Sequence, residues 1–478
     1  MKDLTKDSIT LHVLTMAAPA AITMLVQAAH QIITLYFVSR IGADAVAGVS
    51  AAGTTGFVVG ALTQIVNVGT AALVAHSAGR KDLRDISTLL HQALGLGLVC
   101  ALATVCIVGG LAPIYMSALS KEPAVVEQGV GFLWWISPGF AVLFPMTALM
   151  ATLRGMGVVK APMLIFTLTI ILDALFAAVL IPGRGFIPAM GVEGAGLATT
   201  LSFTIGLILM LVYFRRTERD IVIRRELLAP LLAIWRRIVA VGSPAAAELV
   251  LMFLSMAMVY LVIRDQGAST QAGFGIGFRV LQVVILPGLS VTLAAVPIAG
   301  QNFGAGNTAR VLEVFKTTTI LSSIIMLITT LLVHWYPQAL LSLFTTDDAS
   351  AATATSFLRI ISWTLVAQGL VYTCAFMFQA LGNTMPALMS AAARFVVFSI
   401  PALWLSWQPG FHTDQVWYLW TASIVVQAIV SLWLIQVEFK RKLHPTPPRE
   451  SNNPTSSTTT NSSYVPDSRR HIDPTKTL

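Results

Sequence analysis

Two carboxylates lie deep inside long apolar runs of this sequence, where water is not at hand to solvate them. Asp173 is near the middle of an apolar stretch at 161–181, and Glu248 is near the middle of another at 235–263. An ionised side chain at the centre of a bilayer costs at least ~2.5–3.5 kcal/mol, so such acids usually face protein or water. A carboxyl there can exchange a proton or hold Na⁺, or it can be a structural acid bonded to a neighbouring helix. We predict an ion-coupling role for both, with Glu248 as the main group and Asp173 supporting it.

The first apolar run carries a further titratable group. His30 and Thr34 are four residues apart and therefore share one face of a helix. A histidine at membrane depth can titrate near neutral pH and relay protons, or it can be a neutral, hydrogen-bonded packing residue. We include both residues among the ion-coupling candidates.

Other polar side chains are scattered through the apolar runs. The amides could line a polar cleft for a substrate, and they are Gln27, Gln31, Gln64, Asn67, Gln282 and Gln368. Arg279 and Arg394 also lie within apolar stretches. Each could pair with an acid, bind an anionic headgroup or extend its charged end to the membrane surface, and we favour structural pairing.

The composition defines the elements that must hold these groups. Of the 478 residues, 56% are apolar and only 11% are charged, too few to cover a soluble protein of this size. This excludes a soluble enzyme or nucleic-acid binder despite a net charge of +8, and it indicates an all-α polytopic membrane protein. There is no GxxxxGK[ST] motif and no His/Cys cluster, so neither ATP hydrolysis nor a cofactor or metal is expected.

Twelve apolar stretches are long enough to cross a membrane. They lie at 11–39, 45–75, 88–116, 125–151, 161–181, 193–214, 235–263, 270–303, 313–341, 351–381, 386–407 and 415–437. Most loop lysines and arginines fall on the side of the N-terminus, so we expect both termini in the cytoplasm and the protein in the cell inner membrane.

The sequence repeats itself at one constant offset. Four anchors recur 225 residues later, and they pair Pro19 with Pro244, Gly42 with Gly267, Gly79 with Gly304, and Gly157 with Gly382. Each half holds six helices, an even number, so the halves are parallel repeats related by an axis along the membrane normal. The acids do not obey the repeat, because Phe398 and Thr23 stand where Asp173 and Glu248 would recur.

The repeat predicts two lobes with a cleft between them, the geometry of an alternating-access carrier. We expect an N-terminal lobe at 1–214, a basic cytoplasmic linker at 215–234 and a C-terminal lobe at 235–443. Residues 444–478 are rich in Ser, Thr and Pro and read as a disordered cytoplasmic tail.

Four segments together resemble one family of transporters. The segment from Pro297 to Asn307 with Arg310 is similar to "GQNxGAGN..R", and Gly191–Thr199 is similar to "GVxGAAxAT". Leu153–Gly157 with Pro162-Met163, and Ala380–Thr384 with Pro386, resemble "RGxGDTKxPM". The chain thus resembles a bacterial multidrug and toxic compound extrusion (MATE) transporter over about residues 10–440. The resemblance implies two lobes of twelve helices, and efflux of organic, often cationic, small molecules by H⁺ or Na⁺ antiport in a monomer.

The sequence departs from the family pattern at its charged positions. Thr34 stands where the family carries an acid on its first helix, and no acid between Ala351 and Leu381 matches the one that some members carry on the tenth. Glu248 and Asp173 do match the family's acids on the seventh and fifth helices. A flippase for a lipid-linked precursor, a membrane-embedded acyl or prenyl transferase, and a sensor that signals through its tail remain alternatives at this point. The substrate and the choice between H⁺ and Na⁺ stay open.

Overall fold

A computed structural model describes residues 1–183, 188–218, 229–342 and 347–443, and every regular element in these ranges is a helix. The first half contains α1 (Ile9–Ser39), α2 (Ala43–Gly79), α3 (Leu83–Thr104), the π-helical turn η1 (Val105–Gly109), α4 (Ala112–Leu119), α5 (Pro123–Gly155), α6 (Lys160–Leu180) and α7 (Gly191–Thr217). The second half contains α8 (Leu232–Val262), the 3-10 turn η3 (Arg264–Gln266), α9 (Ala268–Val284), α10 (Leu286–Leu293), α11 (Ala295–Gly304), α12 (Thr308–Trp335), α13 (Pro337–Leu341), α14 (Asp348–Ser362), α15 (Leu365–Ala380), α16 (Met385–Ser406) and α17 (Thr413–Leu443).

Within this part of the chain, length and composition allow 10 helical segments to cross a membrane. Two bent combinations qualify as well, α9 with α10 and α11 at 43° and α14 with α15 at 61°. Each bent combination counts as one span, which gives 12 and confirms the predicted all-α membrane fold. The predicted stretch at 88–116 is one continuous span only as far as Gly109, where a π-helical turn that extends α3 ends, and α4 follows as a separate helix.

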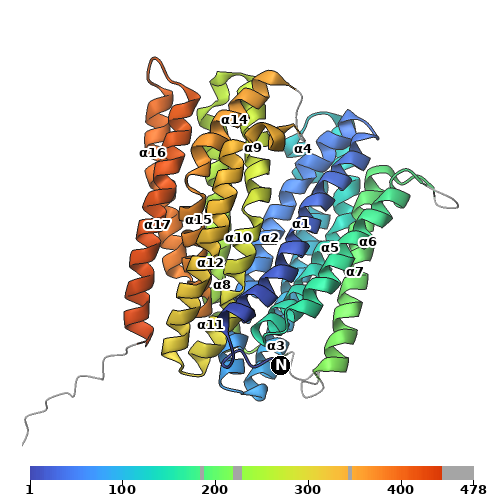
Figure 1. The fold of residues 1–478 in the computed structure, drawn as a ribbon. Coiled ribbons are helices and arrows are strands. Elements are labelled where there is room, and N and C mark those ends of the chain that lie inside the picture. The colour runs from blue at the N-terminus through green and yellow to red at the C-terminus, as the bar shows by residue number, and fades with distance from the viewer. Residues whose placement is uncertain (184–187, 219–228, 343–346, 444–478) are drawn as a thin grey trace, which may run out of the picture.

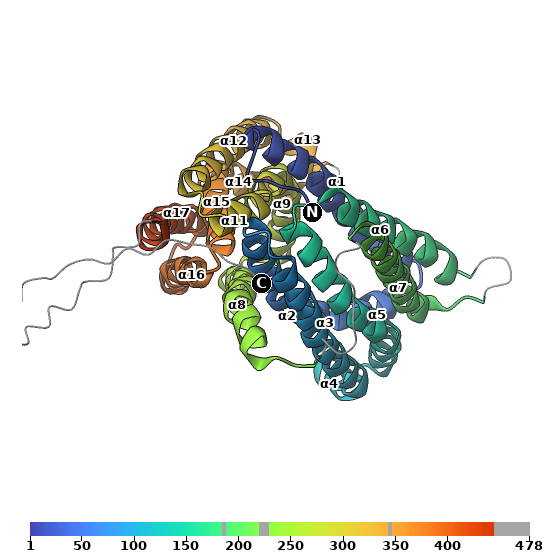
Figure 2. The same ribbon diagram turned by 90° about the horizontal axis from the view of Figure 1, so that it is seen from below.

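The helices form the two expected lobes (Figure 1). Seen along the helix axes, α1 to α7 lie on one side and α8 to α17 on the other, with α2, α8 and α11 near the centre (Figure 2). Residues 219–228 of the predicted linker and the predicted tail at 444–478 lie outside the described residues. The linker and the tail therefore remain predictions.

Close backbone contacts join the lobes, and they follow the repeat. A Cβ added at Gly79 in α2 would overlap the carbonyl oxygen of Gln301 in α11, and one at Gly304 would overlap that of His76. Gly79 and Gly304, like His76 and Gln301, are repeat-related positions. Small residues of this kind let two helix backbones touch directly, which is how membrane helices gain packing energy.

The repeat also recurs in the backbone of the turns. Gly157 and Gly382 follow α5 and α15 with φ of 79° and 70°. Lys81 and Gly306 follow α2 and α11 with φ of 60° and 76°. Of Lys81 and Gly306, only the lysine raises the conformational energy, because a side chain disfavours the left-handed backbone conformation. The parallel duplication predicted from the sequence is therefore visible residue by residue.

The lobes meet at the end of the molecule that carries the N-terminus. There His76 Nε2 lies 2.6 Å from the carbonyl oxygen of Ala380 in the opposite lobe. Gln301 Nε2 donates to the carbonyl of Gly155 at 3.1 Å, again between lobes. These contacts lie at the ends of α2, α5, α11 and α15, so this side of the molecule is closed.

Candidate functional site

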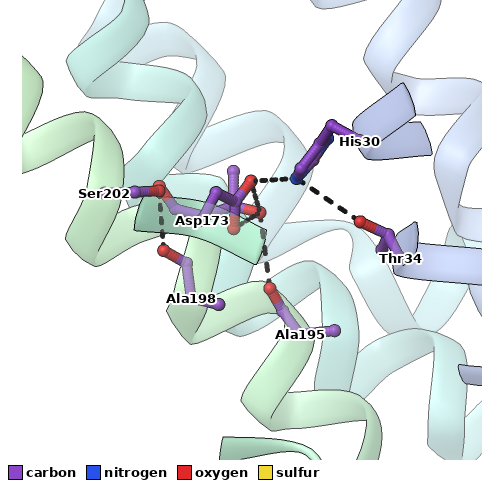
Figure 3. Close-up of polar contacts among 7 residues, drawn as sticks. His30, Thr34, Asp173, Ala195, Ala198 and Ser202 are labelled. Carbon is purple, nitrogen blue, oxygen red and sulfur yellow. Dashed lines mark hydrogen bonds and ion pairs between the residues drawn. The ribbon is translucent and has the colours of Figure 1, made fainter. Parts of the chain in front are cut away.

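The N-terminal lobe holds a buried carboxylate that three helices surround. Asp173 on α6 has a side chain only 5% exposed, and its Oδ2 lies 2.9 Å from Nε2 of His30 on α1. The Thr199 hydroxyl on α7 lies 3.3 and 3.2 Å from the two carboxylate oxygens and can donate to either. Figure 3 shows His30 and the carboxylate pointing toward each other across the space between α1 and α6. The structure thus brings together two of the predicted ion-coupling residues.

Thr34 joins this cluster through the same histidine nitrogen. Its hydroxyl lies 3.4 Å from His30 Nε2, one helical turn further along α1 (Figure 3). If Nε2 carries a hydrogen, it can donate to the carboxylate, and if it does not, it can accept from the Thr34 hydroxyl. The nitrogen therefore has a hydrogen-bond partner in either state: Asp173 when it is protonated and Thr34 when it is not.

The C-terminal lobe holds the second predicted acid. Glu248 on α8 is half-buried, and the charged group that acts on it most strongly is Arg394 on α16. Arg394 Nη1 donates to Oε1 of Gln427 on α17 at 3.3 Å, and its guanidinium carbon lies 5.2 Å from the centroid of the Trp420 ring. Among the described side chains, no lysine, arginine or histidine nitrogen lies within 4 Å of the Glu248 carboxylate, so the acid has no direct ion pair with the arginine.

Tyr372 and Gln368 on α15 complete this second cluster. The tyrosine hydroxyl interacts with Arg394, Glu248 and the Gln368 amide. Gln368 was predicted to line a cleft, and its place beside both charges agrees with that prediction without testing it. Tyr372 and Gln427 were not predicted, because nothing in the local sequence sets a tyrosine or an amide apart from its neighbours.

Two of the predicted cleft amides belong to another set of contacts. Asn67 Nδ2 donates to Gln64 Oε1 at 2.8 Å, and Arg154 Nη2 donates to Asn67 Oδ1 at 2.8 Å. The sequence places Arg154 among the loop cations, but in the structure it lies in the last turn of α5 and its Nε is buried without a partner. It faces residues of both lobes, including Met16 and Pro297.

Among the described side chains, the remaining candidates form no hydrogen bond or ion pair with either charged cluster. Gln27 on α1 and Gln282 on α9 are exposed, which leaves their predicted place in a cleft a prediction, and the side chain of Gln31 is outside the described part of the structure. Arg279 on α9 is exposed and acts on the Tyr260 hydroxyl. No described acid lies within 4 Å of it, so the structural pairing expected for Arg279 is not present here.

A cavity of about 520 Å³ lies away from both acids. It is bounded by α2, α3, η1 and α4, and its lining is mostly aliphatic, with Val58, Leu62, Ile107 and Leu111 among the residues. The chemistry of the candidate site therefore depends on the two charged clusters and not on this cavity.

Sequence comparison identifies the family. The model of the MatE family matches residues 19–179 and 244–405, one match in each lobe. The chain belongs to the MatE family. The two matched segments begin 225 residues apart, the same offset that relates the glycines of the lobe interface, so each lobe is one copy of the MatE unit.

Relatives of this MatE protein are distant but cover most of it. It is 24% identical over 441 residues to the "Probable multidrug resistance protein YoeA" of Bacillus subtilis, covering 89% of this chain and 93% of that one. It is 25% identical over 358 residues to the "Probable multidrug resistance protein NorM" of Thermotoga maritima, with 74% and 76% covered. A solved MOP superfamily transporter from Pyrococcus furiosus superposes with a TM-score of 0.85 at 21% identity, over 93% of this chain and 98% of that one. That similarity establishes a shared fold.

Proposed function

We propose that this MatE protein is a secondary active exporter of organic small molecules that works by alternating access. The observation that carries the proposal is one acid near the middle of a membrane span in each lobe, the buried Asp173 beside His30 and the half-buried Glu248 near Arg394. Intramembrane acids are expensive and are retained for ion or substrate pathways. The multidrug resistance names of its relatives support a small-molecule substrate.

Protons are the coupling ion that these surroundings favour. The groups around Asp173 are an imidazole nitrogen and a hydroxyl, and the charge nearest Glu248 is a guanidinium. A hard cation such as Na⁺ needs several oxygen ligands, and a resident guanidinium repels it. A proton needs one basic atom with two alternative partners, which His30 Nε2 has in Asp173 and Thr34. We therefore assign H⁺ antiport.

The charges of the loops on the closed side predict the membrane orientation. The lobe contacts of His76 and Gln301 lie at the end of the molecule that carries the N-terminus. The loops on that side are rich in lysine and arginine, which is typical of the cytoplasmic face of an inner membrane. On this proposed orientation the closed side would face the cytoplasm, and a substrate would leave on the other side.

A flippase for a lipid-linked precursor is the nearest alternative. A flippase would need a large cationic cavity to hold a phosphate-bearing headgroup. The cavity of about 520 Å³ is instead lined by aliphatic side chains with two threonines, a tyrosine and a cysteine. The exporter is the better fit to the described residues.

Transport in proteoliposomes tests this function. We expect a pH gradient to drive substrate movement, and a Na⁺ gradient at constant pH to drive none. Glu248→Gln should abolish gradient-driven transport but leave substrate counterflow, because the amide cannot carry the proton. Asp265→Asn is the matched control, since this side chain is 82% exposed in the η3 turn. Full gradient-driven transport by the Glu248 variant, or movement driven by Na⁺ alone, would contradict the proposal.

A further inference from the structure

The segment Lys2–Asp7, which precedes α1, lies across the closed side of the molecule. Figure 1 places the N-terminus at this end of the molecule. Leu4 is completely buried although it stands outside any helix. Its side chain belongs to a hydrophobic cluster that includes Val159 from the first lobe and Ile298 from the second. A leucine in this position fills a space that exists only while the lobes are together.

The backbone of the same segment is bonded on both sides. Lys2 N donates to the carbonyl of Met156, which is in the first lobe, at 3.0 Å. Leu4 N donates to Oε1 of Gln301 at 3.0 Å, and Asn302 Nδ2 donates to the carbonyl of Leu4 at 3.1 Å. Two neighbouring amides of α11 thus satisfy both backbone groups of the one buried residue.

Arg310 at the start of α12 adds two more contacts. Its Nη2 donates to the carbonyls of Lys6 and Asp7 at 3.2 and 2.9 Å, and its Nε donates to Oδ1 of Asn302 at 3.2 Å. Asp7 has φ of 60°, a conformation that its own side chain disfavours. The second lobe therefore holds this segment in a shape it would not keep alone.

The residues that precede α8, the first helix of the second lobe, are in turn bonded by a side chain of the first lobe. Gln92 on α3 of the first lobe donates to the carbonyl of Ala229 at 2.8 Å and accepts from Leu231 N at 2.8 Å. Ala229 is the repeat equivalent of Leu4. The segment that precedes the first helix of each lobe is thus hydrogen-bonded by amide side chains of the other lobe.

We propose that residues 2–7 form a latch that holds the lobes together on this side and must leave Gln301, Asn302 and Arg310 before that side can open. The latch is joined covalently to α1, so it stays with the first lobe when the second moves away. Its cost on opening is the exposure of Leu4 and the loss of the bonds to three side chains of the second lobe. This inference rests on the alternating access of the proposed function, but it concerns only the closed side and not the coupling ion.

Cysteine accessibility tests the latch without any substrate or gradient. The reporter is Val159→Cys, which is 5% exposed and lies between the lobes beside Ala294 and Pro297, in a protein whose three native cysteines are replaced by alanine. A maleimide is added to the side of the N-terminus in membrane vesicles. Leu4→Ala should raise the labelling rate at least about tenfold, because a buried leucine truncated to alanine loses most of its packing.

Two further variants decide the result. Leu11→Ala is the matched control, because this leucine on α1 is 58% exposed, and its labelling rate should equal that of the parent. Asn302→Ala keeps Leu4 and the bond between Gln301 and Gly155 but removes the donor to the Leu4 carbonyl, and should raise labelling about fivefold even if Leu4→Ala does not fold. Parental labelling rates in folded Asn302→Ala protein would overturn the latch. Faster labelling would support it even if the transport assay failed.

Discussion

The pair formed by His30 and Asp173 allows its energy to be worked out from the structure. His30→Ala leaves an acid only 5% exposed with the Thr199 hydroxyl as its one remaining donor, at 3.2 to 3.3 Å. Removing one partner of a buried ion pair costs about 3–5 kcal/mol. The histidine side chain is 20% exposed and the threonine bond remains, so we expect a loss near the lower end, about 3 kcal/mol.

Substitution of the acid should cost less stability than substitution of the histidine. Asp173→Asn leaves a neutral amide that Thr199 and His30 can still hydrogen-bond, at a cost of about 1 kcal/mol. In the double variant no charge is left unpaired, and we expect a loss of about 2 kcal/mol, so the pair has a coupling free energy of about 2 kcal/mol. Two independent sites would instead lose the sum of the single effects.

The assay is the free energy of unfolding in detergent, measured for the parent, the two single variants and the double variant. Thr34→Val serves as the control, since its contact with His30 Nε2 is long at 3.4 Å and should be worth no more than about 0.5 kcal/mol. Losses that add within about 0.5 kcal/mol would refute the coupling. In that case the cluster would be a packing arrangement, and its assignment to proton exchange would fall with it.

Four further substitutions test the lobe interface and its turns. Lys81→Gly should stabilise the protein by about 0.5–1 kcal/mol, because φ of 60° suits glycine. The reciprocal Gly306→Ala, at φ of 76°, should destabilise it by a similar amount, and a lower melting temperature for the lysine variant would contradict the reasoning. Gly79→Ala should cost about 1–3 kcal/mol, because the new methyl group overlaps the Gln301 carbonyl. Gly53→Ala in the same helix has nothing within 4 Å of its new Cβ and should gain stability; equal effects of the two would rule out the backbone contact.

The sequence predicts the framework of this molecule well because hydropathy and the repeat act on long segments. An apolar run of sufficient length must be helical in a bilayer, and a constant offset of anchors fixes the pairing of the halves. The breaks inside spans escape such reasoning. The π-helical turn at Val105–Gly109 and the bend after Val284 lie in runs as apolar as their neighbours.

The candidate site is predictable only in part. Depth in an apolar run is enough to single out Asp173 and Glu248, since charge there is costly. Thr199 and Tyr372, which interact with these acids, and Gln427, which accepts from Arg394, come from other helices and are ordinary membrane residues, so only the packing of helices reveals them. Charge also misleads at helix ends, where Arg154 looks like a loop cation until the second lobe covers it.

The reciprocal glycine contacts between α2 and α11 have the form of an isologous interface. Gly79 meets the carbonyl of residue 301, and Gly304, its repeat equivalent, meets the carbonyl of residue 76, the equivalent of 301. In a two-fold symmetric dimer every contact occurs twice in this way, once from each subunit. The two lobes therefore associate as two identical six-helix subunits would, with the subunits joined into one chain. The acids and their partners differ between the lobes and break that symmetry.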